Sequence, residues 1–246
     1  MVDRQRFREL CKETADASIH RDSIGTLGEK ALHAVLKQYF EPDIKKHEIR
    51  VGSYIADIAA DNNIIEIQTR AFNKLRGKLT EFLSISPVTV VYPLPDTKWV
   101  LWIDILTGEV SKRRKSPKRG GIYDAIPELY RIKPFLSHPA IRLCIVLIDV
   151  EEYRYLNGWS EDKKRGSTRC DRIPLDITEE LWFSSTKDYC RFIPPGLHDQ
   201  FTSRDLSNIA GISIRSAQTT LNILHHLGVV RRTGKQSNMY VYQRTI

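Results

Sequence analysis

The chain has 246 residues, of which 41% are hydrophobic, and it carries a formal net charge of +8 with a sequence pI near 9.3. This length accommodates one large domain, or a medium domain with a small one attached, and the apolar content is sufficient for a buried core. No apolar run reaches the roughly 18 residues that a membrane-spanning helix needs, so a membrane span is excluded. The excess of Lys and Arg favours a polyanionic partner.

The N-terminus is polar and charged and lacks the apolar stretch of a signal peptide, which predicts a cytoplasmic protein. The cysteines lie far apart, and no pair has the short spacing of a zinc knuckle. They are Cys11, Cys144, Cys170 and Cys190. We therefore expect neither a disulfide framework nor a structural zinc.

The hydrophobic pattern of the first part of the chain predicts a compact α/β core. A short polar helix is followed by an amphipathic helix, two strands joined by a turn, a second amphipathic helix and a buried strand ended by prolines. After the first helix, these elements fall at 25–40, 54–60, 64–70, 70–83 and 87–95.

The middle of the chain predicts a hairpin over 98–115 with its turn at Thr107 and Gly108, and a buried strand over 141–150. Two basic clusters occur here, at 111–120 and 162–172, and either one alone is compatible with a solvated loop. We expect the first cluster to be a mobile loop that holds phosphates through Arg113, Arg114 and Lys115 without reading sequence. The stretch 151–196 is assigned only as completion of the first domain.

The C-terminal segment predicts two helices joined by a tight turn and followed by two strands around Gly234 and Lys235. Thr202 and Asp205 form the pattern of a capping box, Gly211 ends the first helix, and Ser213 caps the second. The second helix should bury Ile214, Ala217, Leu221 and Leu224.

This order resembles a winged helix-turn-helix domain. Such a resemblance implies that the exposed face of the second helix binds duplex DNA and that the wing reaches its backbone. The helix residues are Arg215, Gln218, Thr219 and Asn222, and the wing residues are Arg231, Arg232 and Lys235. A protein-interaction or dimerisation module is the alternative. From 199 to 246, Lys and Arg outnumber Asp and Glu by six to two, which favours nucleic acid.

Two carboxylates lie within the apolar hairpin: Asp57 in its first strand and Glu66 in its second. Burying ionised carboxylates is costly unless a cation compensates. Across a short antiparallel turn the two acids can face each other over one hard divalent cation, with the carbonyl of Ile67 as a third ligand. Gln68 shares the face of Glu66 and would reach the attacking water.

The acid Asp57 followed by Glu66-Ile67-Gln68 resembles the motif of the PD-(D/E)XK nuclease superfamily, and the element order from 25 to 93 resembles its core. The resemblance implies a restriction-endonuclease-like α/β fold, with a mixed sheet flanked by helices, and Mg²⁺ or Mn²⁺ as cofactor. In many members the preceding helix supplies a further acid, here Glu29. With Thr26 before it, Glu29 also fits a capping box, and both interpretations stay open.

The sequence departs from this motif at Gln68, which occupies the position of the superfamily's lysine. A neutral amide cannot supply positive charge, so the cation must come from elsewhere, and we rank Lys74 first because it lies one turn into the next helix. Lys78 and Arg70 are the other candidates. The competing interpretation of Asp57 and Glu66 is an exposed edge hairpin with solvated acids.

Together these patterns predict a nuclease-like domain over 1–196 and a winged helix-turn-helix domain over 197–246. The first domain has its core at 25–93 and a basic insertion at 94–140. The expected function is that of a metal-dependent endodeoxyribonuclease acting on double-stranded DNA. The alternative is a non-catalytic DNA-binding transcriptional regulator with a degenerate nuclease fold. Whether the chain forms a homodimer stays open.

Overall fold

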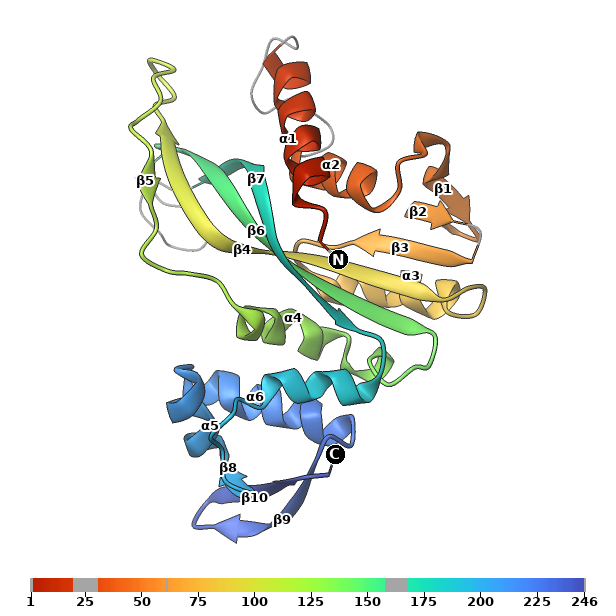
Figure 1. Cartoon of the computed structure of the whole chain (residues 1–246), viewed down its shortest axis with the longest axis vertical. Coiled ribbons are helices and arrows are strands. Elements are labelled where there is room, and N and C mark those ends of the chain that lie inside the picture. The colour runs from red at the N-terminus through yellow and green to blue at the C-terminus, as the bar shows by residue number, and fades with distance from the viewer. Residues whose placement is uncertain (1, 20–30, 61, 158–167, 246) are drawn as a thin grey trace. The chain divides into compact units, whose positions relative to one another are not determined.

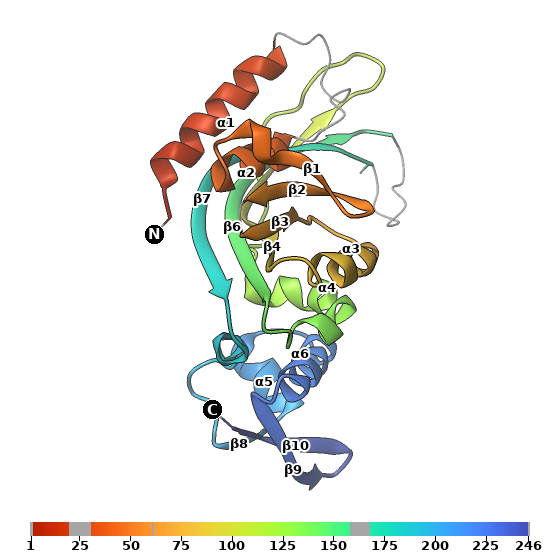
Figure 2. The same cartoon turned by 90° about the vertical axis from the view of Figure 1, so that its right-hand side faces the viewer.

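The computed structural model describes residues 2–19, 31–60, 62–157 and 168–245, and its elements are drawn in Figures 1 and 2. The α-helices are α1 (Arg4–Ile19), α2 (Ala31–Phe40), α3 (Leu75–Phe82), α4 (Ile126–Arg131), α5 (Ser203–Ala210) and α6 (Ile214–His226). Short 3-10 helices are η1 (Ile44–Lys46), η2 (Phe72–Lys74), η3 (Ile122–Ala125), η4 (Lys133–Phe135) and η5 (Thr186–Phe192).

The strands form a mixed sheet and a smaller C-terminal sheet. They are β1 (His47–Val51), β2 (Tyr54–Ala60), β3 (Asn63–Ile67), β4 (Val88–Ile103), β5 (Arg114–Lys115), β6 (Ile141–Tyr155), β7 (Thr168–Phe183), β8 (Gln200–Thr202), β9 (Val230–Gln236) and β10 (Met239–Arg244). Within the described residues, seven strands make the larger sheet in the order β1-β2-β3-β4-β6-β7, with β5 paired to β4. The smaller sheet has the order β8-β10-β9.

The strand β3 lies between two neighbours and is therefore an interior strand. It runs antiparallel to β2, with Ile65 opposite Ile58, and parallel to β4, with Glu66 opposite Val90. Because both of its edges are paired, residues 64–67 are all buried. The alternative of an exposed edge hairpin is therefore wrong for the second strand.

The chain divides into two compact units. Unit 1 comprises 1–47, 93–121 and 146–180, and unit 2 comprises 48–92, 122–145 and 181–246. The predicted boundary after residue 196 does not coincide with this division, and a separate C-terminal domain stays a prediction.

In unit 1 the helix α1 is fastened to β7 and to α2. Arg8 Nη2 lies 2.6 Å from Asp176 Oδ2 of β7, and Arg4 pairs with the same carboxylate. On the side of α2, the ring of Phe7 meets that of Tyr39 edge to face, with centroids 5.4 Å apart. The predicted first helix is thus part of the fold, held by charge on one side and aromatic packing on the other.

In unit 2 the crossover from β3 to β4 is made by η2 and α3. The predicted helix starts later than expected, because Ala71 adopts a left-handed conformation with φ of 58° and a 3-10 turn follows it. Glu128 accepts a hydrogen bond of 2.8 Å from Phe72 N, which holds this turn. The stripe Leu75, Leu79 and Phe82 is buried as predicted.

Two further predictions need correction. The strand predicted to stop at its prolines continues as β4 to Ile103, because the φ that proline fixes is compatible with extended backbone. Part of the expected mobile basic loop is the strand β5, in which Arg114 lies opposite Val100. The prediction of a mobile loop is therefore wrong there. The unassigned stretch 151–196 contains β7 and η5.

The C-terminal elements follow the predicted order, with two corrections. Gly234 and Lys235 lie inside β9, and the chain reverses after it at Ser237, which has a φ of 54°. Ile214 is 44% exposed instead of buried, because it is the first residue of α6 and precedes the packed part of that helix. The capping box of Thr202 and Asp205 and the left-handed Gly211 are present.

Among the described helices, none is both long and apolar enough to cross a membrane.

The turn between β1 and β2 provides a stability test. Gly52 has a φ of 58°, and a Cβ there would lie 1.8 Å from Glu81 Oε1, the atom that accepts a hydrogen bond from Ser53 N. Gly52→Ala should therefore cost about 1 kcal/mol for the strained backbone and about 1 kcal/mol for the displaced hydrogen bond. Gly108→Ala is the matched control, because Gly108 has a φ of 73° and open space around it. Equal losses in urea unfolding would contradict the role of Glu81.

Candidate functional site

The two hairpin acids meet where β2 and β3 separate. Ile58 lies opposite Ile65 in the antiparallel pair. Next to this pair, the side chains of Asp57 and Glu66 bond the backbone of the opposite strand. Asp57 Oδ2 accepts from Ile67 N at 2.7 Å, and Asp57 N donates to Glu66 Oε1 at 3.3 Å. The prediction that the two carboxylates face each other across the hairpin agrees with this geometry.

The counter-charge comes from α3. Lys78 Nζ lies 2.9 Å from Glu66 Oε2 and 3.1 Å from Oε1, and it donates a 2.7 Å hydrogen bond to Ile55 O. Lys74, which we ranked first among the candidate cations, is exposed at the end of η2. The structure therefore brings Lys78 to the carboxylate in place of Lys74.

Burial makes Glu66 an unusual carboxylate. Its exposed fraction is 1%, whereas Asp57 is half-buried. Loss of solvation, followed by the negative charge of Asp57, raises the pKa of Glu66 to about 7, although Lys78 acts in the opposite direction. Such a group exchanges its proton near neutral pH, and a further cation beside the pair would favour its ionised form.

Of the two other predicted catalytic residues, Gln68 and Glu29, the structure describes only Gln68. Gln68 follows β3, and its Nε2 donates to Arg70 O, so its amide is held beside the start of the crossover. Its backbone N donates to Val91 O at 2.9 Å. Glu29 and its capping partner Thr26 lie outside the described residues.

The donor set of the site consists of oxygen atoms, the ligands that Mg²⁺ and Mn²⁺ prefer. Asp57 and Glu66 supply two carboxylates, and the Ile67 carbonyl belongs to the residue whose N–H already bonds Asp57. In the part of the chain that the structure describes, no group of three or more His, Cys, Asp or Glu side chains could hold a metal. A site with two carboxylates still suits Mg²⁺, which usually keeps several waters and takes further oxygens from a phosphate.

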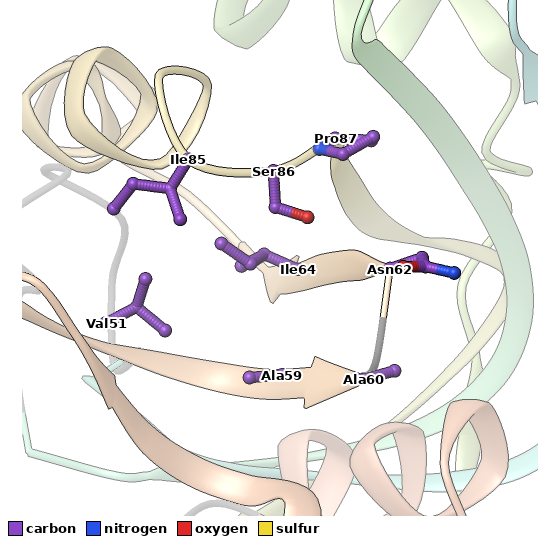
Figure 3. Close-up of a pocket in the computed structure, with 8 residues that line it drawn as sticks. All are labelled: Val51, Ala59, Ala60, Asn62, Ile64, Ile85, Ser86 and Pro87. Carbon is purple, nitrogen blue, oxygen red and sulfur yellow. The ribbon is translucent and has the colours of Figure 1, made fainter.

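A pocket of about 570 Å³ adjoins the turn of the hairpin (Figure 3). It is lined by Val51, Ala59, Ala60, Asn62, Ile64, Ile85, Ser86 and Pro87. Ala59 and Ile64 lie opposite each other in β2 and β3. Because side chains alternate along a strand, they share a face with Asp57 and Glu66. Of the predicted catalytic residues that the structure describes, none lines this pocket.

The predicted DNA-binding face of α6 is only partly accessible. Arg215 and Gln218 are exposed, and Thr219 Oγ1 donates to Arg215 O at 2.9 Å. Asn222, by contrast, accepts a 3.0 Å hydrogen bond from Lys133 Nζ of η4. Asn222 is half-buried, so it is less accessible than Arg215 and Gln218, and its role in binding DNA stays a prediction.

The predicted wing residues lie on β9 and are exposed. Arg231 donates to Gln243 Oε1 at 2.7 Å, and the guanidinium of Arg232 lies 3.9 Å from the centre of the Tyr240 ring. Lys235 Nζ lies 5.1 Å from the same ring. The two strands thus carry cations stacked on an aromatic side chain that is itself 40% exposed.

Residues 30–184 match the model of a protein family described as a domain of unknown function, DUF8091. Because this match spans more than half of the chain, the protein belongs to that family. The matched region contains the acids of the hairpin and Lys78.

One relative is an uncharacterized protein of Treponema pallidum (strain Nichols), which is 28% identical over 226 residues. The alignment covers 90% of this chain and 88% of the relative, so it extends beyond the family match into the C-terminal segment. No solved structure matches the chain.

Proposed function

We propose that this protein is a metal-dependent endonuclease that hydrolyses the phosphodiester bonds of double-stranded DNA. The observation that carries the proposal is the cluster of Asp57, Glu66 and Lys78, in which two facing carboxylates lie beside one ammonium group. Phosphodiester hydrolysis needs such oxygen donors, a positive charge near the phosphate and a positioned water.

The order of elements around the cluster supports a restriction-endonuclease-like core. A helix, α2, precedes the strands, and the crossover helix α3 joins β3 to the parallel strand β4. We take Asp57 on β2 and Glu66 on β3 as the two acids of the PD-(D/E)XK motif. In this proposal Lys78 takes over the charge that the superfamily's lysine supplies and that Gln68 lacks.

The residues present suit a bound Mg²⁺ or Mn²⁺, which Asp57, Glu66 and the carbonyl of Ile67 would hold. Such an ion supplies Lewis-acid polarisation of the phosphate and a more acidic water. The protein's own residues then have separate tasks. Lys78 would neutralise charge, and the Gln68 amide, whose Nε2 donates to Arg70 O, would accept a hydrogen bond from the attacking water on the face of Glu66.

The C-terminal segment is proposed to be a winged helix that binds the duplex. What supports this is the strand order β8-β10-β9 around α5 and α6, together with the exposed Arg215 and Gln218 and the cations of β9. Since Asn222 is bonded to Lys133, the proposed reading face is restricted to the N-terminal half of α6. The cations of β9 would hold the DNA backbone.

The proposal is tested by metal titration and plasmid cleavage. Asp57→Asn and Glu66→Gln should weaken Mn²⁺ binding in calorimetry at least tenfold and reduce cleavage by at least about a hundredfold, since each removes a charged ligand. Lys74→Gln, on the same crossover, is the control and should behave like wild type. Gln68→Lys should keep or raise the cleavage rate. Equal metal affinity in all variants would remove the main support for a nuclease.

A second candidate is a DNA-binding regulator without catalysis. It is favoured by the internal pairing of the site, since both oxygens of Glu66 already accept from Lys78 and Asp57 bonds the backbone. Retained duplex binding, with neither metal binding nor cleavage, would be the signature of this alternative.

A further inference from the structure

A second charged cluster, outside the candidate active site, surrounds Glu152 in unit 1. Glu152 lies on β6 and has an exposed fraction of 0%. Its neighbours come from three strands of the sheet, β4, β6 and β7, which run side by side in Figures 1 and 2. They are Lys98, Arg154, Arg169 and Arg172.

The contacts use both oxygens of the carboxylate. Arg154 Nε donates to Glu152 Oε1 at 2.7 Å, and Lys98 Nζ lies 3.6 Å from the same oxygen. Arg172 Nε donates to Oε2 at 2.9 Å, and Arg169 Nε lies 3.4 Å from it. Four cations therefore converge on one acid.

This cluster contains more positive charge than its carboxylate can balance. Among the described contacts, Lys98, Arg154 and Arg172 all share the single carboxylate of Glu152, and Arg169 adds a fourth positive charge beside it. Burial alone would raise the pKa of Glu152, but the charges of Arg172, Lys98 and Arg169 outweigh it and lower that pKa to about 2. Burial lowers the pKa of Lys98, and the charges of Arg154 and Arg172 act in the same direction. Structural pairing of Glu152 alone would require one or two of these cations.

The surplus donors can be reached from solvent. Each guanidinium carries five N–H groups, so Arg154 and Arg172 together have more donors than the one carboxylate of Glu152 can accept. The exposed fractions of the side chains are 14% for Arg154, 18% for Arg172, 25% for Lys98 and 36% for Arg169. Side chains that are held in place and partly desolvated bind an anion more strongly than mobile surface lysines do.

The same part of unit 1 carries tryptophans beside cations. The Arg154 guanidinium lies 6.0 Å from the centre of the Trp102 ring. The guanidinium of Arg113 lies 4.2 Å from the centre of the Trp99 ring, and the ammonium of Lys115, on β5, lies 5.9 Å from it. Basic side chains interleaved with aromatic rings are typical of surfaces that follow a nucleic-acid backbone.

We infer that Lys98, Arg154, Arg169 and Arg172, fixed around Glu152, form a phosphate-binding site for the backbone of a nucleic acid. This inference rests on the proposed function in taking DNA as the partner. It adds a contact that lies outside both the hairpin acids and the C-terminal segment. Since the ligand is the phosphodiester group, the site holds any sequence alike.

The test removes two of the four cations and keeps the buried acid paired. In Arg169→Gln/Arg172→Gln, Glu152 retains Arg154 and Lys98. The control is Lys12→Gln/Lys45→Gln, which removes the same charge from two exposed residues of unit 1. Affinity for a short duplex of arbitrary sequence is measured by fluorescence anisotropy in EDTA, over a range of salt concentrations.

The cluster variant should bind roughly ten- to a hundredfold more weakly than the control at about 0.1 M salt, and its salt slope should be smaller by about 2. Affinity and slope equal to those of the control would overturn the inference while leaving the proposed nuclease intact. If the double variant does not melt cooperatively, Arg169→Gln alone should still reduce the slope by about 1.

Two further measurements distinguish binding of free phosphate from binding of nucleic acid, and DNA binding from cleavage. Inorganic phosphate is titrated into the wild type and the cluster variant, and binding of phosphate without any cluster-dependent binding of duplex would overturn the nucleic-acid assignment. Glu66→Gln should lose cleavage but keep cluster-dependent DNA binding. A wild type that binds no duplex at all would contradict both this inference and the proposed function.

Discussion

Lys78→Ala should lower the free energy of unfolding at pH 8 by about 3–5 kcal/mol, because it leaves the carboxylate of Glu66 buried without its cation. The exposed Lys74 lies one helical turn earlier, and Lys74→Ala should cost less than about 0.5 kcal/mol. Urea unfolding of the two variants and of wild type measures the difference. A loss below about 1 kcal/mol would mean that Lys78 does not stabilise Glu66.

The pH dependence of this loss follows from the raised pKa of Glu66, which is about 7 in the folded protein against an ordinary value of 4.5. The folded state binds the proton of Glu66 more tightly than the unfolded state does. Protonation of Glu66 therefore stabilises the folded protein fully below pH 4.5, and this stabilisation is lost as the pH rises through 7. Removing Lys78 raises the pKa of Glu66 in the folded protein further, so in that variant the loss of stability continues above pH 7.

The cost of Lys78→Ala should therefore be small at pH 4, where Glu66 is protonated in both variants. Adding Glu66→Gln to Lys78→Ala should restore most of the stability at pH 8, since an amide needs no cation. A cost that stays constant from pH 4 to pH 8 would show that packing of the lysine stem, not charge, is responsible.

Glu152→Gln should destabilise the protein by about 3–5 kcal/mol at low salt, because it removes the buried negative charge that four cations contact. The neighbouring Glu151→Gln is the matched control. Glu151 pairs with the half-exposed Arg113 at 2.8 Å, and its loss should cost at most about 1 kcal/mol. Salt should reduce the cost of Glu152→Gln by screening the repulsion among the cations.

Acid titration provides the second measurement for Glu152. Its folded pKa of about 2 lies below the ordinary 4.5, so the unfolded state binds the proton more tightly. The resulting stability, about 3 kcal/mol, is present above pH 4.5 and is lost as the pH falls through 2. Glu152→Gln should lack this part of the acid dependence. An acid profile identical to that of wild type would contradict the assignment.

The local sequence pattern was sufficient to predict that the two hairpin acids lie on facing strands. Apolar residues alternate around Asp57 and Glu66, and the Asp and Asn residues between the strands favour a turn, so the two acids could be placed opposite each other. The caps of α5 and α6 were equally readable, because a capping box depends on residues three positions apart.

The buried stripe of the crossover helix could have identified Lys78, in place of Lys74, as the cation of the site. Lys78 lies three residues after Leu75 and directly before Leu79, so it falls within the buried stripe of α3. A lysine at such a position must meet an acceptor in the interior, and Glu66 is that acceptor. The late start of α3, set by the left-handed Ala71, was not visible in the hydrophobic pattern.

The cluster around Glu152 could not be predicted from the sequence. Lys98 and Arg172 are far apart in the chain and come together only because β4 and β7 both lie beside β6. The strand β7 mixes charged and apolar residues, with Asp176 paired to α1 and Arg172 to Glu152, so its pattern resembled a loop. Which strands become neighbours depends on the topology of the sheet, and the local sequence pattern does not reveal it.

The parallel pairing of β3 and β4 ties the candidate site to the length of one connection. Parallel neighbours need a crossover, and here the crossover helix itself delivers the ammonium group to Glu66. Each residue added or removed between Gln68 and Lys78 would turn that side chain by about 100° around the helix. Relatives that keep this site should therefore keep the spacing of ten residues from Gln68 to Lys78.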